Sequence, residues 1–191
     1  MPSTLQVDKI IDSSATTNKE LAEYASGNWS WGSGVPAGTV LQVVYFQDTD
    51  QDISSFTTED TWTPTGLTKA ITTKADNSNI YISAIVHAFL AQHTDNTWNA
   101  LNFRINKGSN AIWYSNSNTS AHNGYYYGRY TDSDSAREMK ATHMSYLDTG
   151  NTANAGTSLT YSVSFSNREA MPITFKSTYG VSQMTLMEVM P

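Results

Sequence analysis

The stretch NIYISAIVHAFLAQ, residues 79–92, is the most apolar run in the chain and decides the fold class. Apolar residues fall at every second position, which places them on one face of a β-strand: Ile80, Ile82, Ala84, Val86, Ala88 and Leu90. Read as a helix, the run would present a broader apolar surface. Its β-branched residues and the turn residues Asp76-Asn77-Ser78 before it favour a strand. We therefore predict a long strand with one face in a core.

Two flanking stretches predict strands with different surroundings. Residues 39–46, TVLQVVYF, are apolar on both faces and predict a central strand. Residues 67–75, LTKAITTKA, follow a turn at Pro64-Thr65-Gly66 and predict a polar strand at a surface or edge.

Three later stretches continue the pattern. Residues 100–114 predict a hairpin that turns at 107–110, with Leu101, Phe103 and Ile105 on one face and Asn102, Arg104 and Asn106 on the other. Residues 158–167 alternate most regularly, with inward positions at Leu159, Tyr161, Val163 and Phe165. Residues 181–190 predict the final strand. Many short strands separated by turns indicate an all-β protein, an antiparallel jelly-roll sandwich.

The first 38 residues read differently. Thr17 and Glu20 have capping-box spacing, and Gly27 can end a helix, so we predict one short helix of about two turns here. Residues 27–38 read as a linker that carries Trp29 and Trp31, which should dock on this subunit or on a neighbour. The predicted division is therefore an N-terminal arm, helix and linker at 1–38 and a β-sandwich knob at 39–191.

Composition excludes several classes of function. The 11 Lys and Arg are scattered and the net charge is −6, which argues against nucleic acid as a partner. Cysteine is absent, so disulfides and thiolate chemistry are excluded. Charged residues amount to only 15%, so Ser, Thr, Asn and Gln must cover much of the surface. Asp8, Lys9 and Asp12 interrupt the first apolar positions, so we expect neither a secretory leader nor membrane insertion.

Metal and catalytic patterns are weak. Asp48, Asp50, Asp52 and Glu59 have EF-hand spacing, but Ile53 stands where that loop requires Gly, so we predict an acidic loop without calcium. The four histidines, His87, His93, His122 and His143, show no metal-ligand spacing. Asp132, Asp134 and Glu138 could supply a carboxylate pair but lie in an expected surface loop. We predict no catalytic residue, no cofactor and no enzymatic activity.

The segment GYYYGRY, residues 124–130, is the strongest binding candidate. Tyrosine combines apolar area with a hydroxyl at low entropic cost, which suits a surface for a host glycan or protein. The candidate receptor residues are Tyr125, Tyr126, Tyr127, Arg129 and Tyr130. The alternative is an ordinary strand whose alternate tyrosines pack in the core or between subunits.

Three stretches together resemble small tail-fibre-like virion proteins of marine tailed bacteriophages. They are STLQVDKIIDSS at the start, GTVLQVVYF with TWTPTGLTKAITTKADNSNIYISAIV in the middle, and TYSVSFSN with STYGVSQMTLMEV at the end. The resemblance implies a virion surface protein, a homotrimer built on a jelly roll like that of tumour necrosis factor, and no catalysis. The TTNKELAEYA segment and the lack of a long fibre shaft depart from that pattern.

Two functions fit this resemblance, both in a virion protein made in the host cytoplasm. One is a trimeric tail-fibre or receptor-binding knob that attaches a phage to its host. The other is a trimeric capsid decoration (cement) protein that stabilises the head. In either case the N-terminal segment would be an arm that docks on a neighbouring subunit or on other virion proteins. Its candidate residues are Leu5, Val7, Ile10, Ile11, Trp29 and Trp31.

Overall fold

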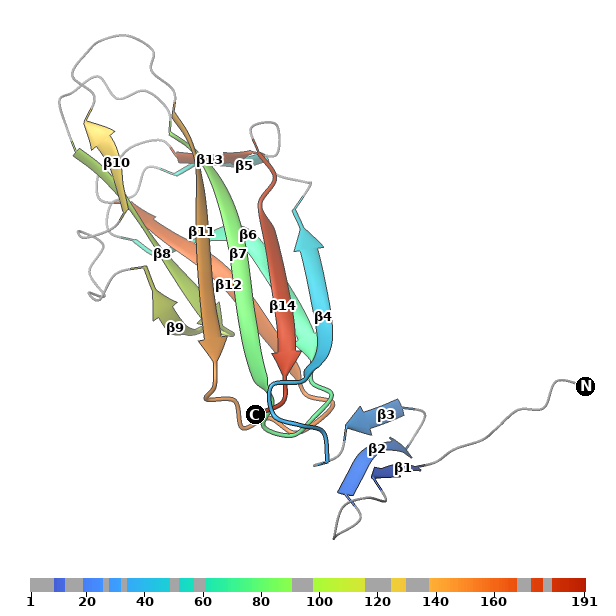
Figure 1. Cartoon of the computed structure of the whole chain (residues 1–191). Coiled ribbons are helices and arrows are strands. Elements are labelled where there is room, and N and C mark those ends of the chain that lie inside the picture. The colour runs from blue at the N-terminus through green and yellow to red at the C-terminus, as the bar shows by residue number, and fades with distance from the viewer. Residues whose placement is uncertain are drawn as a thin grey trace, which may run out of the picture.

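A computed structural model describes residues 9–12, 19–25, 28–31, 34–48, 52–56, 61–90, 98–115, 125–129, 138–167, 173–176 and 180–191 of the chain (Figure 1). All regular elements in these ranges are β-strands. They are β1 (Lys9–Asp12), β2 (Lys19–Ala25), β3 (Asn28–Trp31), β4 (Val40–Gln47), β5 (Asp52–Phe56), β6 (Thr63–Thr72), β7 (Asn79–Leu90), β8 (Trp98–Lys107), β9 (Asn110–Tyr114), β10 (Tyr125–Arg129), β11 (Glu138–Asp148), β12 (Ser158–Asn167), β13 (Ile173–Lys176) and β14 (Gln183–Val189).

Two antiparallel sheets face each other in a sandwich. In the first sheet β11 pairs with one edge of β7 along its length, while β14 and then β4 extend the other edge. Strands β13 and β5 continue that second edge at the far end of β7. In the second sheet the order is β6-β12-β8, and β9 and β10 pair with different parts of β8.

This connectivity is a jelly roll. Between β4 and β14 the chain passes repeatedly from one sheet to the other, so that β4-β14-β7-β11 faces β6-β12-β8 with β9 and β10. All of these pairings are antiparallel, as in the two interlocked Greek keys of that fold. The predicted all-β, antiparallel jelly-roll sandwich is confirmed.

The core lies between the sheets and follows the predicted alternation. On β7, Ile80, Ile82 and Val86 are fully buried, and Ala84 and Ala88 nearly so. The opposite sheet contributes buried residues from β6, β8 and β12, namely Leu67, Ile71, Leu101, Phe103, Ile105, Tyr161, Val163 and Phe165. The ring of Phe165 also meets that of Phe175 edge-on, with centroids 4.7 Å apart. Burying each such side chain contributes roughly 1.5–3 kcal/mol, so this cluster is the main source of stability.

The prediction that residues 39–46 form a central strand is wrong. Among the described strands, β4 pairs only with β14, which places it at the edge of its sheet. One face, with Val44 and Phe46, packs on the core, while Val43 and Tyr45 on the other face are each 54% exposed. The strand is therefore apolar on both sides for two different reasons: one side packs on the core, and the other forms an exposed apolar surface.

The predicted polar strand at the surface or edge is confirmed for residues 67–72, which belong to β6; within the described sheets β6 pairs only with β12. The predicted turn at Pro64-Thr65-Gly66 instead lies inside β6. The register to β12 shifts there, and Gly66 has a φ of +85°. A proline is tolerated because β6 is an edge strand, and a glycine with positive φ allows the irregularity.

The predicted short helix is also wrong. Residues Lys19–Ala25 form β2, which pairs with β1 on one side and β3 on the other. A two-turn helix with one capping box is too short to persist by itself. In the strand, the backbone of β2 forms hydrogen bonds with β1 on one edge and β3 on the other. These bonds to neighbouring strands favour the strand over a short isolated helix. The described part of the chain contains no helix able to span a membrane.

Part of the expected arm and linker forms this same small sheet. Strand β3 covers Asn28–Trp31, so the linker prediction fails for these residues. Strand β1 pairs with β2 in antiparallel register, so residues 9–12 of the expected arm pair within the chain. The small sheet lies at the end of the sandwich where the C-terminus also lies (Figure 1).

Candidate interaction surfaces

The tyrosine-rich segment forms the edge strand β10. Tyr125 pairs with Leu101 and Tyr126 with Ala100 of β8, and the register then shifts before Arg129. The strand alternative is thus correct for the backbone of residues 125–129. Tyr130 lies outside the described residues. In Figure 1, β10 lies toward the end of the sandwich opposite the small sheet.

The arm residues are only partly within the described chain. Ile10 pairs with Ala22 and Ile11 with Glu20, while Trp29 pairs with Tyr24. Leu5 and Val7 lie outside the described residues. The residues that the structure brings together are therefore Ile10, Ile11, Trp29 and Trp31, all in one three-stranded sheet.

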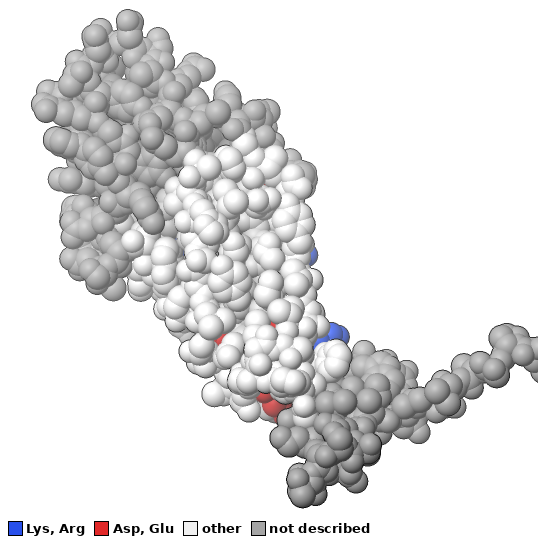
Figure 2. All heavy atoms as spheres, viewed as in Figure 1, with Lys and Arg blue, Asp and Glu red and all other residues white. Residues whose placement is uncertain are grey.

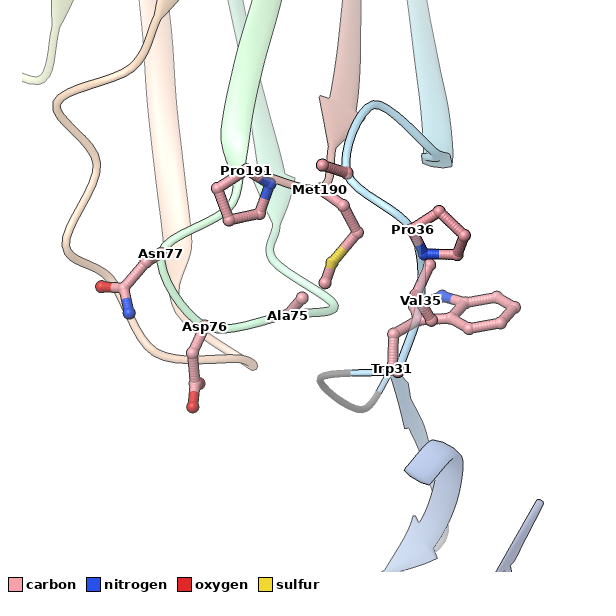
Figure 3. Close-up of a pocket in the computed structure, with 10 residues that line it drawn as sticks. Trp31, Val35, Pro36, Ala75, Asp76, Asn77, Met190 and Pro191 are labelled. Atoms are coloured by element: carbon pink, nitrogen blue, oxygen red, sulfur yellow. The ribbon is translucent and has the colours of Figure 1, made fainter. Parts of the chain in front are cut away.

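Trp31 joins this sheet to the sandwich. Its backbone N–H donates a hydrogen bond to the carbonyl of Lys74, at 3.2 Å. Beside it lies a hollow of about 750 Å³, bordered by the 34–37 segment, the β6–β7 turn and the last two residues (Figure 3). Met190 points toward Ala75, whereas the side chains of Asp76 and Asn77 point away from Met190 (Figure 3). The described residues that line the hollow come from three separate segments, so it lies at a junction between elements.

The buried carboxylate of Glu188 fixes the β6–β7 turn at this same end. It accepts hydrogen bonds from the backbone N–H groups of Lys74 and Ala75, at 2.8 and 3.1 Å, and from Gln42 at 2.6 Å. Three donors from β4 and the turn thus meet one carboxylate on β14. Sequence reasoning missed Glu188, although an acidic residue on the inward register of an apolar strand was the available signal.

A second buried carboxylate joins the two sheets. Asp148 of β11 accepts a hydrogen bond from the hydroxyl of Tyr161 on β12, at 2.8 Å, and pairs with Lys107 of β8 at 2.9 Å. Burial raises the pKa of the Tyr161 hydroxyl, and the hydrogen bond to Asp148 and its negative charge raise it further. The Tyr161 hydroxyl therefore stays protonated and donates its hydrogen bond to Asp148, which connects the two sheets.

The outward side of β8 is polar but largely covered. Asn102 and Asn106 are buried, and the guanidinium of Arg104 lies 4.8 Å from the ring centroid of Trp62. Trp62 in turn meets Tyr114 edge-on, with centroids 5.8 Å apart. This cation–π contact stabilises the position of Trp62, and so of the segment before β6, against the second sheet.

The first sheet presents a different outer side, which we call the neutral face. The strand registers align its outward residues in rows across β4, β14, β7 and β11. One row is Val43–Met187–Tyr81–Leu147, the next is Tyr45–Thr185–Ser83–Ser145, and the third is Gln47–Gln183–Ile85–His143. Val40 and Val189 pair beside the first row. The sequence analysis missed this face because it assigned β4 to the centre of the sheet.

The remaining candidates do not form a site within the described residues. Asp48 and Asp52 are described, but Asp50 and Glu59 are not, and Asp52 begins strand β5. His87 and His143 lie on the paired strands β7 and β11, whereas His93, His122, Asp132 and Asp134 lie outside the described chain. Glu138 begins β11 instead of lying in a loop. No cluster of three potential metal ligands occurs among the described side chains.

Comparisons with known proteins give no family. No family model matches the chain, and no curated protein matches it. Among solved structures, one of infectious bursal disease virus strain Gx overlays at a TM-score of 0.39 with 10% identity, covering 95% of this chain and 50% of the other. A structure of the T13 particle of the same virus overlays at 0.36 with 10% identity, covering 91% and 42%. The chain spans about half or less of the length of these two matched chains.

Proposed function

We propose that this protein is a structural subunit of a tailed-phage virion, a trimeric β knob that acts as a tail fibre or receptor-binding component in host attachment. The observation that carries the proposal is the place of the resembling stretches in the fold. The middle stretches become β4, β6 and β7, and the final ones become β12 and β14. Segments far apart in sequence thus build one jelly roll, the fold that the resemblance implies.

The two ends of the sandwich support separate roles. Strand β10, with the tyrosine-rich segment, lies toward the end opposite the small N-terminal sheet (Figure 1). One end can therefore face a receptor while the other joins the particle. In this proposal, Tyr126 and Arg129 contribute to a surface for a host glycan or protein.

The N-terminal segment would provide the attachment to the particle. The backbone hydrogen bond from Trp31 to Lys74 connects the small sheet to the sandwich. Attachment of the small sheet to the particle would therefore also hold the knob. Removing residues 1–12, and with them β1, should leave a soluble folded knob that no longer joins particles. Full occupancy of the truncated chain on purified virions would place the attachment on the sandwich itself.

The second candidate is a capsid decoration protein. The position of the small sheet at one end of the sandwich supports this candidate as well (Figure 1). A knob anchored at one end by a small sheet also suits a trimer clamped to a capsid shell. The two candidates differ in location, because a tail component lies at one vertex and a decoration protein covers the head.

Electron microscopy of particles labelled with an antibody against this chain separates the two. Label confined to the tail supports the tail-fibre function, and label spread over the head supports decoration. Particles that carry no label, from lysates in which the free protein is labelled, would contradict both.

A further inference from the structure

The neutral face carries most of the exposed large hydrophobic side chains of the described chain. Among the described residues, five large hydrophobic side chains are exposed, and four of them lie on this face. They are Val40, Val43, Tyr45 and Leu147, between 43% and 54% exposed. Through Met187 and Tyr81, Val43 and Leu147 belong to one continuous apolar row from β4 to β11. Scattered apolar residues need no explanation, but a continuous row across a whole sheet marks an interaction surface.

The same face lacks formal charge. None of the described side chains in its three rows is Lys, Arg, Asp or Glu. In Figure 2 the described atoms on this side of the sandwich are mostly white, with the few charged atoms near the lower end and the right margin. The chain as a whole carries a net charge of −6. The three rows thus contain none of the acidic residues that give this charge.

These two properties point to a particular occupant. Copies of an acidic chain repel one another at long range, and a contact surface without charge adds no further repulsion when they meet. A partner recognised by charge would find no opposite charge in the described rows of the neutral face. Beside the apolar row lie hydroxyl groups, of Ser83, Thr185 and Tyr45 among others, which both donate and accept hydrogen bonds. Around a threefold axis, one part of this face on each copy meets a different part of the same face on the next copy, and hydroxyl groups can serve as donor or acceptor in either part.

We propose that the neutral face is the surface through which copies of this chain associate, with the Val43–Met187–Tyr81–Leu147 row at the centre of the contact. This inference rests on the proposed function, since it names the surface by which the trimeric knob assembles. The apolar row supplies the burial, and the hydroxyl row beside it forms the polar rim. The Arg104 side of the sandwich, with its polar covered residues, faces outward from the assembly.

The test is sedimentation equilibrium of the full-length chain and three variants at about 10 µM, with circular dichroism of each. In Val43→Asp and Leu147→Asp, a charge enters the row at either end, at side chains that are exposed in the single chain and so leave its fold intact. Ala70→Asp is the matched control, because Ala70 is exposed on β6 of the opposite sheet.

We expect the wild type and Ala70→Asp to sediment as the same oligomer. Both row variants should sediment as the 21.0 kDa chain, with a dissociation constant raised about 100-fold or more. Row variants that keep the wild-type mass would overturn the assignment of the face and leave the virion function standing. A wild type that is monomeric would overturn self-association altogether, whereas absence of the chain from particles bears on the function alone.

Discussion

The hydroxyl of Tyr161 lies 2.8 Å from Oδ2 of Asp148 and donates a hydrogen bond to it across the interior of the sandwich. The two residues belong to opposite sheets, on β12 and β11. Both are at least 95% buried, because Tyr161 is fully buried and Asp148 is 5% exposed. The pair therefore links the sheets where Lys107 also reaches the same carboxylate.

The first prediction concerns this pair at high pH. Because the pKa of Tyr161 is raised in the folded state, the folded chain keeps a proton that the unfolded chain loses above about pH 10. Its contribution is fully present below pH 10, and stability should fall by up to about 1.4 kcal/mol per pH unit above that. Tyr161→Phe should cost about 1.5–3 kcal/mol at pH 8 and remove this part of the alkaline slope.

Urea denaturation at pH 8, 10 and 11 measures both effects. Tyr114→Phe is the control, because Tyr114 is only partly buried and lies on the outer side of the sandwich against Trp62. This variant keeps the hydrogen bond from Tyr161 to Asp148, so it should keep the part of the alkaline slope that Tyr161 causes. Equal slopes in the wild type and in Tyr161→Phe would show that the hydroxyl ionises as freely in the folded chain as in the unfolded one.

The second prediction concerns Glu188. Replacing it by Gln keeps the shape but turns one acceptor oxygen into a donor that faces backbone N–H groups of the β6–β7 turn. We expect the free energy of unfolding to fall by about 2–4 kcal/mol, since several donors lose a charged acceptor in a buried place. Asp76→Asn is the matched control, because Asp76 is exposed and accepts a single bond from Ala155. If Glu188→Gln lowers the free energy of unfolding no more than Asp76→Asn does, the proposed role of Glu188 in holding the β6–β7 turn is wrong.

The third prediction concerns the close approach of Gly180 to His87. A Cβ placed on Gly180 would lie 2.6 Å from Cγ of His87, and the φ of Gly180 is +154°. Gly180→Ala should therefore destabilise the chain by more than about 2 kcal/mol. Gly108→Ala, with φ of +58° and open space around it, should cost about 1 kcal/mol. Thermal unfolding measures both, and combining Gly180→Ala with His87→Ala should recover part of the loss.

The fourth prediction concerns the proposed receptor surface on β10. Replacing Tyr126 and Arg129 with Ala should weaken binding to host cells while the oligomer stays folded. A cell-binding assay with labelled protein, together with circular dichroism, measures the two properties. Loss of folding would instead assign these side chains to packing, in the core or between subunits.

The sequence was sufficient to predict much of the sandwich. On β7 and β12, apolar residues alternate because one face of each strand lies in the core, and burial of Ile80, Ile82, Tyr161 and Val163 confirms this. Alternation is a property of the strand itself, so it can be recognised without knowing which strands are neighbours.

The wrong predictions concern segments whose structure depends on the strands with which they pair. Residues 19–25 have a helix-like beginning, and only pairing with β1 and β3 makes them a strand. Residues 39–46 are apolar on both faces, which fits a central strand and an edge strand with an exposed apolar side equally well. Composition could not distinguish these cases, because they differ in long-range contacts. The neutral face remained hidden for the same reason, since it depends on the register of four strands.

The measurement that tests the proposed virion role most directly is quantitative mass spectrometry of virions purified from a culture in which this gene is expressed. The amount of this chain is compared with that of the major capsid protein after gradient purification. A virion structural protein predicts a fixed stoichiometry in multiples of three copies per particle, small for a tail knob and in the hundreds for a decoration protein. A chain abundant in the lysate but absent from the purified particles would contradict the account.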